Sequence, residues 1–168
     1  MELRDKNKKT ILGIDPGSSK IGYGVILSKN GTIKPKALGY GYIDLKNCIG
    51  DGKRLLQLHE DLKEILSKYN PHEIAIENVY FFKNAKTITP VMQSKGVILF
   101  TAAQAGIKVY EYTPLQIKQT ISGYGRGEKN FIKRLVQLSL DINTNIEPDD
   151  ASDALAIALC HLRHLIVI

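Results

Sequence analysis

Residues 11–27 read ILGIDPGSSKIGYGVIL, two apolar stretches joined by the turn-forming sequence Asp15-Pro16-Gly17. The second stretch alternates small and large apolar residues and is followed by Asn30-Gly31, a pair that is typical of tight turns. This pattern predicts a β-hairpin, which a third strand over residues 32–43 extends to an antiparallel meander. Residues 44–52 are expected to form the loop that follows.

The remainder of the chain alternates between helical and extended patterns. Apolar residues recur at helical spacing from Lys53 until Asn70-Pro71 ends the element. Further strands are predicted at 73–77 and 107–112, and further helices at about 86–105, 114–122, 128–140 and from about 149. Three antiparallel strands followed by strands reached through helical crossovers indicate an α/β fold, with a mixed five-stranded sheet flanked by helices.

The composition is that of a folded domain. Of the 168 residues, 43% are hydrophobic and 24% charged, which suffices for a core without disulfides or a structural metal. We expect a single domain over residues 1–168, in which residues 1–9 form a loose basic tail. Cys48 and Cys160 form no CxxC pair, and the longest apolar run, 154–160, is too short to span a bilayer. A protein of the reducing cytoplasm, without a membrane partner, is therefore expected.

Basic and acidic residues are unevenly distributed along the chain. It carries 23 Lys and Arg against 17 Asp and Glu, a net charge of +6, yet residues 141–168 hold five acids and only one arginine. A basic surface favours a polyanion such as nucleic acid, although this signal is not specific by itself. The acidic end of a basic protein requires a separate explanation.

Four acidic residues stand at the ends of apolar elements. Asp15 and Glu77 each terminate an apolar strand, while Asp150 and Asp153 lie at the start of the apolar segment 154–160. A turn residue, an exposed strand end and a helix cap are the ordinary alternatives for Asp15, Glu77 and Asp150 respectively. None of these explains Asp153, which follows the capping position in a helix that must be largely buried.

The chemistry of these acids indicates a metal site. No cluster of His or Cys accompanies them, so the oxygen-preferring ions Mg²⁺ or Mn²⁺ are the fitting cations. Four carboxylates balance two divalent ions, which together can activate water and stabilise the leaving oxygen at phosphorus. The sequence therefore predicts a nuclease whose basic segments hold the phosphate backbone. His161 and His164, one turn apart, lack the further ligands that a second metal site would need.

Four motifs, in order and spacing, resemble the RuvC family of Holliday-junction resolvases over about residues 11–161. They are ILGIDPGS at 11–18, AIENVY at 75–80, KQT at 118–120 and DASDALAIA at 150–158. The resemblance implies a ribonuclease H-like fold, a homodimer, and Mg²⁺-dependent symmetrical nicking of opposed strands in four-way junction DNA. It further implies 5′-phosphate and 3′-hydroxyl ends, a role in recombination and repair, and RuvA- and RuvB-type branch-migration partners.

The resemblance also assigns site residues. The residues that match the family's four metal-binding catalytic acids are Asp15, Glu77, Asp150 and Asp153. We expect Asp15 to bridge two Mg²⁺ ions, with Mn²⁺ as an alternative. The expected DNA contacts are Tyr80, Phe81, Lys83, Lys86, Lys118, Arg126 and Lys129. Aromatic side chains near lysines suit stacking on unpaired bases together with phosphate contact. The helix at about 86–105 is the candidate dimer interface.

Three other functions stay open on the sequence. Another ribonuclease H-like nuclease, such as an RNase H or a ribosomal-RNA-processing relative, would act on a different substrate. An actin- or Hsp70-like nucleotide-binding domain has a similar Asp-x-Gly turn, but that fold uses two such domains and over twice this length. A catalytically silent junction-binding protein would not need four intact acids.

Overall fold

The computed structural model describes residues 8–29, 34–78, 85–123 and 128–166, with the side chains of all of these except 85–87. The strands are β1 (Lys8–Asp15), β2 (Lys20–Lys29), β3 (Lys36–Asp44), β4 (Glu73–Glu77) and β5 (Lys108–Tyr112). The helices are α1 (Asp51–Tyr69), α2 (Ala85–Gln104), α3 (Pro114–Ser122), α4 (Lys129–Leu140) and α5 (Asp149–Ile166).

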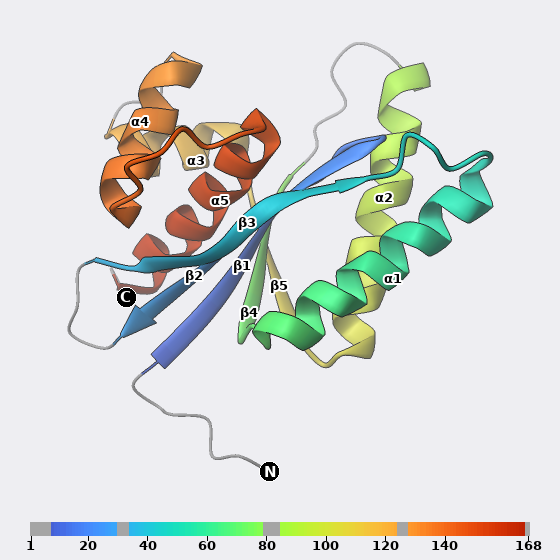
Figure 1. Cartoon of the computed structure of the whole chain (residues 1–168), viewed down its shortest axis with the longest axis horizontal. Coiled ribbons are helices and arrows are strands. Elements are labelled where there is room, and N and C mark those ends of the chain that lie inside the picture. Colours follow the sequence, from blue (N-terminus) through green and yellow to red (C-terminus); the bar gives the residue numbers. More distant parts are fainter. Residues whose placement is uncertain (1–7, 30–33, 79–84, 124–127, 167–168) are drawn as a thin grey trace.

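The five strands form one mixed sheet in the order β3-β2-β1-β4-β5. The first three strands pair antiparallel, and β4 and β5 join them parallel to β1. Helices α1 and α2 cover one face of the sheet, and α3, α4 and α5 cover the other (Figure 1). This arrangement confirms the predicted α/β fold with a mixed five-stranded sheet flanked by helices.

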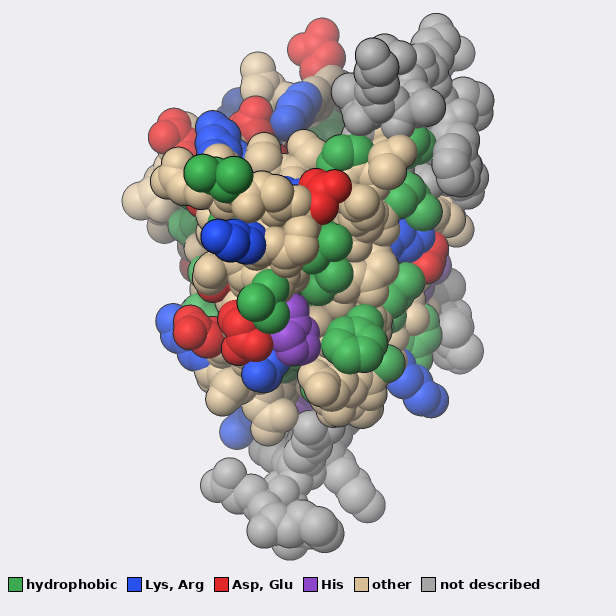
Figure 2. All heavy atoms as spheres, turned by 90° about the vertical axis from the view of Figure 1, so that its right-hand side faces the viewer, with side chains coloured by type: hydrophobic (Ala, Val, Ile, Leu, Met, Phe, Trp, Pro, Cys, Tyr) green, Lys and Arg blue, Asp and Glu red, His purple; other side chains and the backbone are tan. Residues whose placement is uncertain are grey.

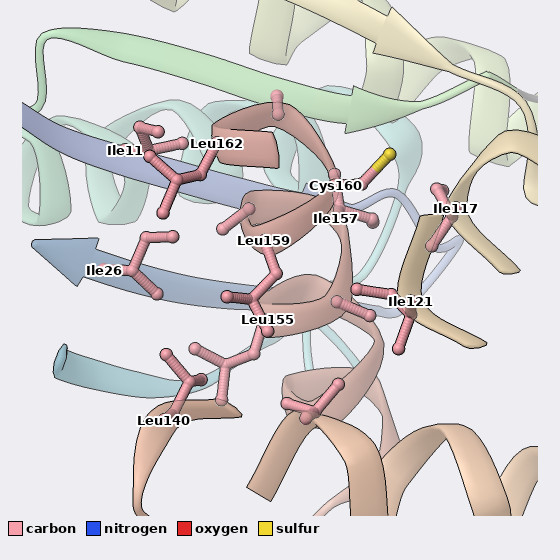
Figure 3. Packing of buried hydrophobic residues seen from close by; sticks show 14 of the residues in the cluster. Ile11, Ile26, Ile117, Ile121, Leu140, Leu155, Ile157, Leu159, Cys160 and Leu162 are labelled. Carbon is pink, nitrogen blue, oxygen red and sulfur yellow. The ribbon is translucent and has the colours of Figure 1, made fainter. Parts of the chain in front are cut away.

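Glycines let α5 lie directly on the sheet. A Cβ atom on Gly22 of β2 would stand 2.0 Å from the carbonyl oxygen of Asp150, and one on Gly13 of β1 would stand 2.0 Å from that of Ala154. No side chain fits between these main chains. Beyond the glycines, apolar side chains of α5 fill the space against β1 and β2, as Leu155 and Leu159 show in Figure 3. The sheet backbone thus positions the start of α5.

The opposite face has a second apolar core. Leu58 and Leu62 of α1 and Ile98 of α2 are fully buried against Leu12 and Ile76 of the sheet. The helical spacing that predicted α1 therefore marks its inner face. The two cores hold the central strands β1 and β4 from both sides, so the ends of these strands are well defined.

The structure corrects three boundaries. The third strand, predicted over residues 32–43, is β3, which begins at Lys36, and residues 34 and 35 lie outside it. Strand β1 begins at Lys8, so residues 8 and 9 do not belong to a loose tail: Lys9 pairs with Ser28 in the sheet, and its ammonium lies 2.7 Å from Glu73. Helix α1 begins at Asp51, two residues before the predicted start. Within the described part of the chain, none of the helices is long and apolar enough to cross a membrane.

Candidate active site

Two of the four acids lie side by side because their strands are parallel neighbours. Asp15 is the last residue of β1 and Glu77 the last residue of β4. The register pairs Ile14 with Ile76, so the acids that follow them lie at the same edge of the sheet. Parallel strands that end together are a common place for functional side chains.

The other two acids come from the first turns of α5, above the same edge. Asp15 pairs with Gly22 in the β1–β2 register, and the main chain of Asp150 rests on Gly22. Asp153 follows one turn later on α5. Its side chain is 36% exposed, so it is less buried than the sequence indicated, although the helix beyond it is buried almost completely. The four predicted acids are thus gathered from three elements.

The electrostatics show how near these carboxylates are to one another. Burial raises the pKa of Asp15 from 3.8 to about 8, and the charges of Glu77, Asp153 and Asp150 add to this rise. The pKa of Glu77 is raised by burial and by the charge of Asp153. Carboxylates that raise one another's pKa in this way favour either a proton or a cation between them.

A lysine partly neutralises the group. Nζ of Lys129, in the first turn of α4, lies 3.1 Å from Oδ2 of Asp153 and 3.4 Å from Oδ2 of Asp149. Burial raises the pKa of Asp153, whereas its hydrogen bond to Lys129 lowers it. Among the described residues, no three Asp, Glu, His or Cys side chains stand in ready coordination geometry. The donor set is nevertheless composed of oxygen ligands with unbalanced negative charge, which fits a hard divalent cation.

A cavity of about 270 Å³ opens beside the acids. Glu77 and Asp153 line it together with Lys118 and Lys129, and the remaining wall is apolar, formed by Pro114, Ile117, Ile132 and Ala156. Lys118 lies in α3, whose start is fixed by the N-cap Thr113 through a reciprocal capping box with Gln116. Two cations and an apolar wall beside carboxylates suit a phosphodiester with its sugar.

The other expected DNA contacts are not placed by the structure. Tyr80, Phe81, Lys83 and Arg126 lie outside the described residues, and only the main chain of Lys86, in α2, is described. These assignments therefore stay predictions.

The histidines of α5 belong to a different network. The Nδ1 atom of His161 lies 2.7 Å from the hydroxyl of Tyr112, and its Nε2 atom lies 2.8 Å from Oε2 of Glu73. Nδ1 of His164 lies 2.8 Å from the carbonyl oxygen of Cys160. His161 is therefore engaged at the opposite end of β4 from Glu77.

Two buried cations near the acids were missed at the sequence level. They are Arg54 of α1 and Lys95 of α2, each with a relative exposure of 7%. Helical spacing could have revealed both, because Arg54 lies four residues before Leu58 and Lys95 three residues before Ile98, on the inner faces of their helices.

Comparison with known proteins places the chain among nucleases. Residues 11–161 match the family model of the crossover junction endodeoxyribonuclease RuvC. The chain is 47% identical to the RuvC crossover junction endodeoxyribonuclease of Syntrophomonas wolfei over 153 residues, covering 91% of this chain and 88% of that protein. It is 45% identical to the same enzyme of Caldicellulosiruptor saccharolyticus over 152 residues, covering 90% and 91% respectively.

Solved structures agree with this placement. The structure of T. thermophilus RuvC in complex with Holliday junction substrate has a TM-score of 0.89 at 29% identity, and the match covers 95% of this chain and 96% of that chain. The fowlpox virus resolvase, solved with Holliday junction DNA, has a TM-score of 0.60 at 16% identity, which shows a shared fold. The fold is thus that of ribonuclease H-like resolvases.

Proposed function

This chain belongs to the RuvC family of crossover junction endodeoxyribonucleases, a family of metal-dependent nucleases, and we propose that it resolves Holliday junctions at the acids described above. The observation that carries the proposal is the meeting of Asp15, Glu77 and the first turns of α5 beside a cavity that contains two lysines. Such a group can hold a cation and a phosphate together, which a binding protein does not require.

In this proposal each residue has a defined role. Asp15, Glu77, Asp150 and Asp153 would hold two Mg²⁺ ions, and the charges of the other three acids raise the pKa of Asp15. The chemistry that Mg²⁺ supplies when bound at such a site is activation of water and stabilisation of the leaving oxygen. Lys118 and Lys129 bind the phosphates of the cleaved strand, and the apolar wall orients its sugar. The products carry 5′-phosphate and 3′-hydroxyl ends.

Two cuts in opposed strands need two active sites, so we propose a homodimer with α2 at its interface. The exposed side of α2 includes Phe100, which is 61% exposed, and Gly96, where a Cβ atom would meet nothing within 4 Å. Figure 2 shows hydrophobic side chains on the face where α1 and α2 lie in Figure 1. A two-fold interface of this kind matches the approximate two-fold symmetry of a four-way junction.

The partners and location beyond the junction rest on family membership alone. We propose RuvA- and RuvB-type branch-migration proteins as partners in recombination and repair, and the cytoplasm as the place of action. Co-purification of this chain with a RuvA–RuvB complex assembled on a junction tests the partnership, and retention only in the presence of junction DNA would limit it to a shared substrate.

Nicking of a synthetic mobile four-way junction, with and without Mg²⁺, tests the proposed function. We expect paired nicks in opposed strands with Mg²⁺, and no nicks of plain duplex or an RNA–DNA hybrid. Preferred cleavage of the hybrid would instead identify a ribonuclease H-type enzyme. Junction binding without cleavage at any divalent cation concentration would identify a silent binder, and thermal stabilisation by ATP would favour a nucleotide-binding protein.

A further inference from the structure

Arg54 and Lys95 are buried cations that do not touch the catalytic acids, so their presence near the site needs a reason. Burial of a cation is costly unless hydrogen bonds satisfy it, and an apolar residue would often serve stability better. Each side chain instead donates one hydrogen bond to the segment that follows Asp15 or Glu77, and its other hydrogen bonds go to α2 or β5.

Arg54 connects the segment after Asp15 to α2. Its Nη1 atom donates to the carbonyl oxygen of Ser18 at 2.8 Å and to Oγ of Ser94 at 3.0 Å. Its Nη2 atom donates to Oε1 of Gln93 at 2.7 Å. Ser18 lies three residues after Asp15, in the short connection between β1 and β2. The planar guanidinium thus fixes this connection against two consecutive residues of α2.

Lys95 makes the equivalent link for Glu77. Its Nζ atom donates to Oδ1 of Asn78 at 3.2 Å and to Oε2 of Glu111 at 2.7 Å. Asn78 directly follows Glu77, and its main-chain N–H donates to the carbonyl oxygen of Tyr112 at 2.8 Å. The residue after the acid is therefore held from α2 and from β5 at once.

The three residues 93–95 form part of a single turn of α2. Lys95 bonds the residue after β4 directly, whereas Gln93 and Ser94 are linked to the connection after β1 through Arg54. We propose that Arg54 and Lys95 are positioning residues, which act through Ser18 and Asn78 to keep Asp15 and Glu77 at the spacing that a shared cation requires. This inference rests on the proposed function of these acids. The hydrogen bonds that both side chains donate go to groups other than the four acids, so we assign neither residue a catalytic role.

The experiment compares Arg54→Gln, Arg54→Lys and Lys95→Met with the wild-type chain. Lys63→Gln is the matched control, because Lys63 is an exposed cation of α1 that pairs only with neighbouring Glu60. Junction affinity is measured by gel shift without Mg²⁺, nicking by single-turnover kinetics over a Mg²⁺ titration, and folding by circular dichroism. Stabilisation by Mg²⁺ is measured separately as the shift in Tm without DNA.

We expect the variants to bind the junction within about twofold of wild type and to need about tenfold more Mg²⁺ for half-maximal nicking, as residues behind metal ligands typically do. Their Tm shift by Mg²⁺ should also need more Mg²⁺. Arg54→Lys should still need more Mg²⁺ than the wild-type chain, because an ammonium cannot bridge Ser18 and Gln93 as a guanidinium does. The control should match wild type in every measurement.

A lower Tm with unchanged Mg²⁺ requirement, in both nicking and thermal shift, would overturn the inference and leave a role in stability alone. If Arg54→Gln does not fold, Arg54→Lys and Ser94→Ala decide the question by the same measurements. If the wild-type chain does not nick junctions, the proposed function fails, and the thermal shift by Mg²⁺ still tests the positioning role independently.

Discussion

Nζ of Lys129 lies 3.1 Å from Oδ2 of Asp153, inside the group of acids. Burial lowers the pKa of Lys129, but its hydrogen bond to Asp153 and the charges of Asp153 and Asp149 outweigh this and raise it. The lysine therefore compensates one acid when no metal is bound. A divalent cation held by these acids would take over that role and would leave Lys129 available to a phosphate.

Replacement of Lys129 tests this relationship. Lys129→Met should lower the rate of junction nicking by about tenfold or more, because a charged phosphate contact is lost. It should also lower the Tm of the metal-free protein and enlarge the increase in Tm upon addition of Mg²⁺, since the acids lose their internal counter-charge. Lys63→Met, an exposed change on α1, should alter neither quantity. An equal response of both variants to Mg²⁺ would contradict the explanation.

Asp15→Asn should abolish nicking and preserve junction binding, since lysines supply affinity whereas the acids hold metal. Gel shifts and nicking assays on one junction measure the two properties. Loss of both would mean that Asp15 is structural. Asp141→Asn, an exposed change at the C-cap of α4, is the matched control and should retain both.

Asp15→Asn should also raise the stability of the protein in the absence of metal. The pKa of Asp15 is about 8 in the folded chain against 3.8 for the free group, so between these values the folded state holds a proton that the unfolded state has released. The contribution of Asp15 to stability therefore falls as pH rises from about 4 to 8. Asn copies the protonated form, and we expect Asp15→Asn to gain about 1–3 kcal/mol at pH 7 in urea unfolding with EDTA. The same pH dependence of stability in Asp15→Asn and in the wild-type chain would contradict this.

Gly22→Ala should be severely destabilising, because the new Cβ atom would stand 2.0 Å from the main-chain oxygen of Asp150, which cannot move away by a rotamer change. We expect a loss of about 3 kcal/mol or more in urea unfolding. Gly52→Ala is the matched control: a Cβ atom there meets nothing within 4 Å, and in the first turn of α1 it should be neutral or stabilising by up to about 1 kcal/mol. Similar stabilities of the two variants would show that α5 can shift from the sheet.

The Glu73–His161 pair should make the protein sensitive to acid. His161 is 1% exposed, and burial lowers its pKa below 6.5 although Glu73 opposes this. Burial alone would raise the pKa of Glu73, but hydrogen bonds from Lys9 and His161 bring it below 4.5. In both cases the unfolded chain binds a proton that the folded chain does not, so the contribution of this pair to stability falls as pH drops below about 6.5 and falls further below 4.5.

Urea unfolding between pH 4 and 7 measures this dependence. His161→Phe should be less stable at pH 7, because Glu73 and Tyr112 lose a partner, yet its stability should change less between pH 6.5 and 5 than that of the wild-type chain. His59→Gln, which alters a histidine bonded to Thr101 on the other face of the sheet, should keep the wild-type slope. The same slope in both variants would place the titrating group elsewhere.

Sequence patterns predicted those features that depend on local periodicity. Each such feature is visible within one segment: the alternation in residues 11–27, the helical spacing of α1, and the acids at the ends of apolar runs. The strands and the helix that these patterns predict occur in the structure. Lys9 is a residue for which local patterns are not sufficient. The polar sequence around it is typical of a tail, but Lys9 belongs to β1, where it pairs with Ser28 of β2 and forms an ion pair with Glu73. Contacts between distant segments override local polarity.

Relationships between elements were not predictable in this way. The approach of Lys129 to Asp153 depends on how α4 packs against α5, and the links made by Arg54 depend on where α2 crosses α1. A single sequence shows that such cations exist but not what they face. The roles of Tyr80 and Arg126 as DNA contacts remain predictions.

The contact between Gly22 and Asp150 has an evolutionary consequence. Main chain rests on main chain there, so the approach of the acid-bearing helix to the sheet does not depend on any rotamer. Side chains elsewhere on the surface can therefore change while the distance between this helix and the sheet stays the same. As this fold diverges among proteins, we expect the substrate to change long before the geometry of the catalytic site does.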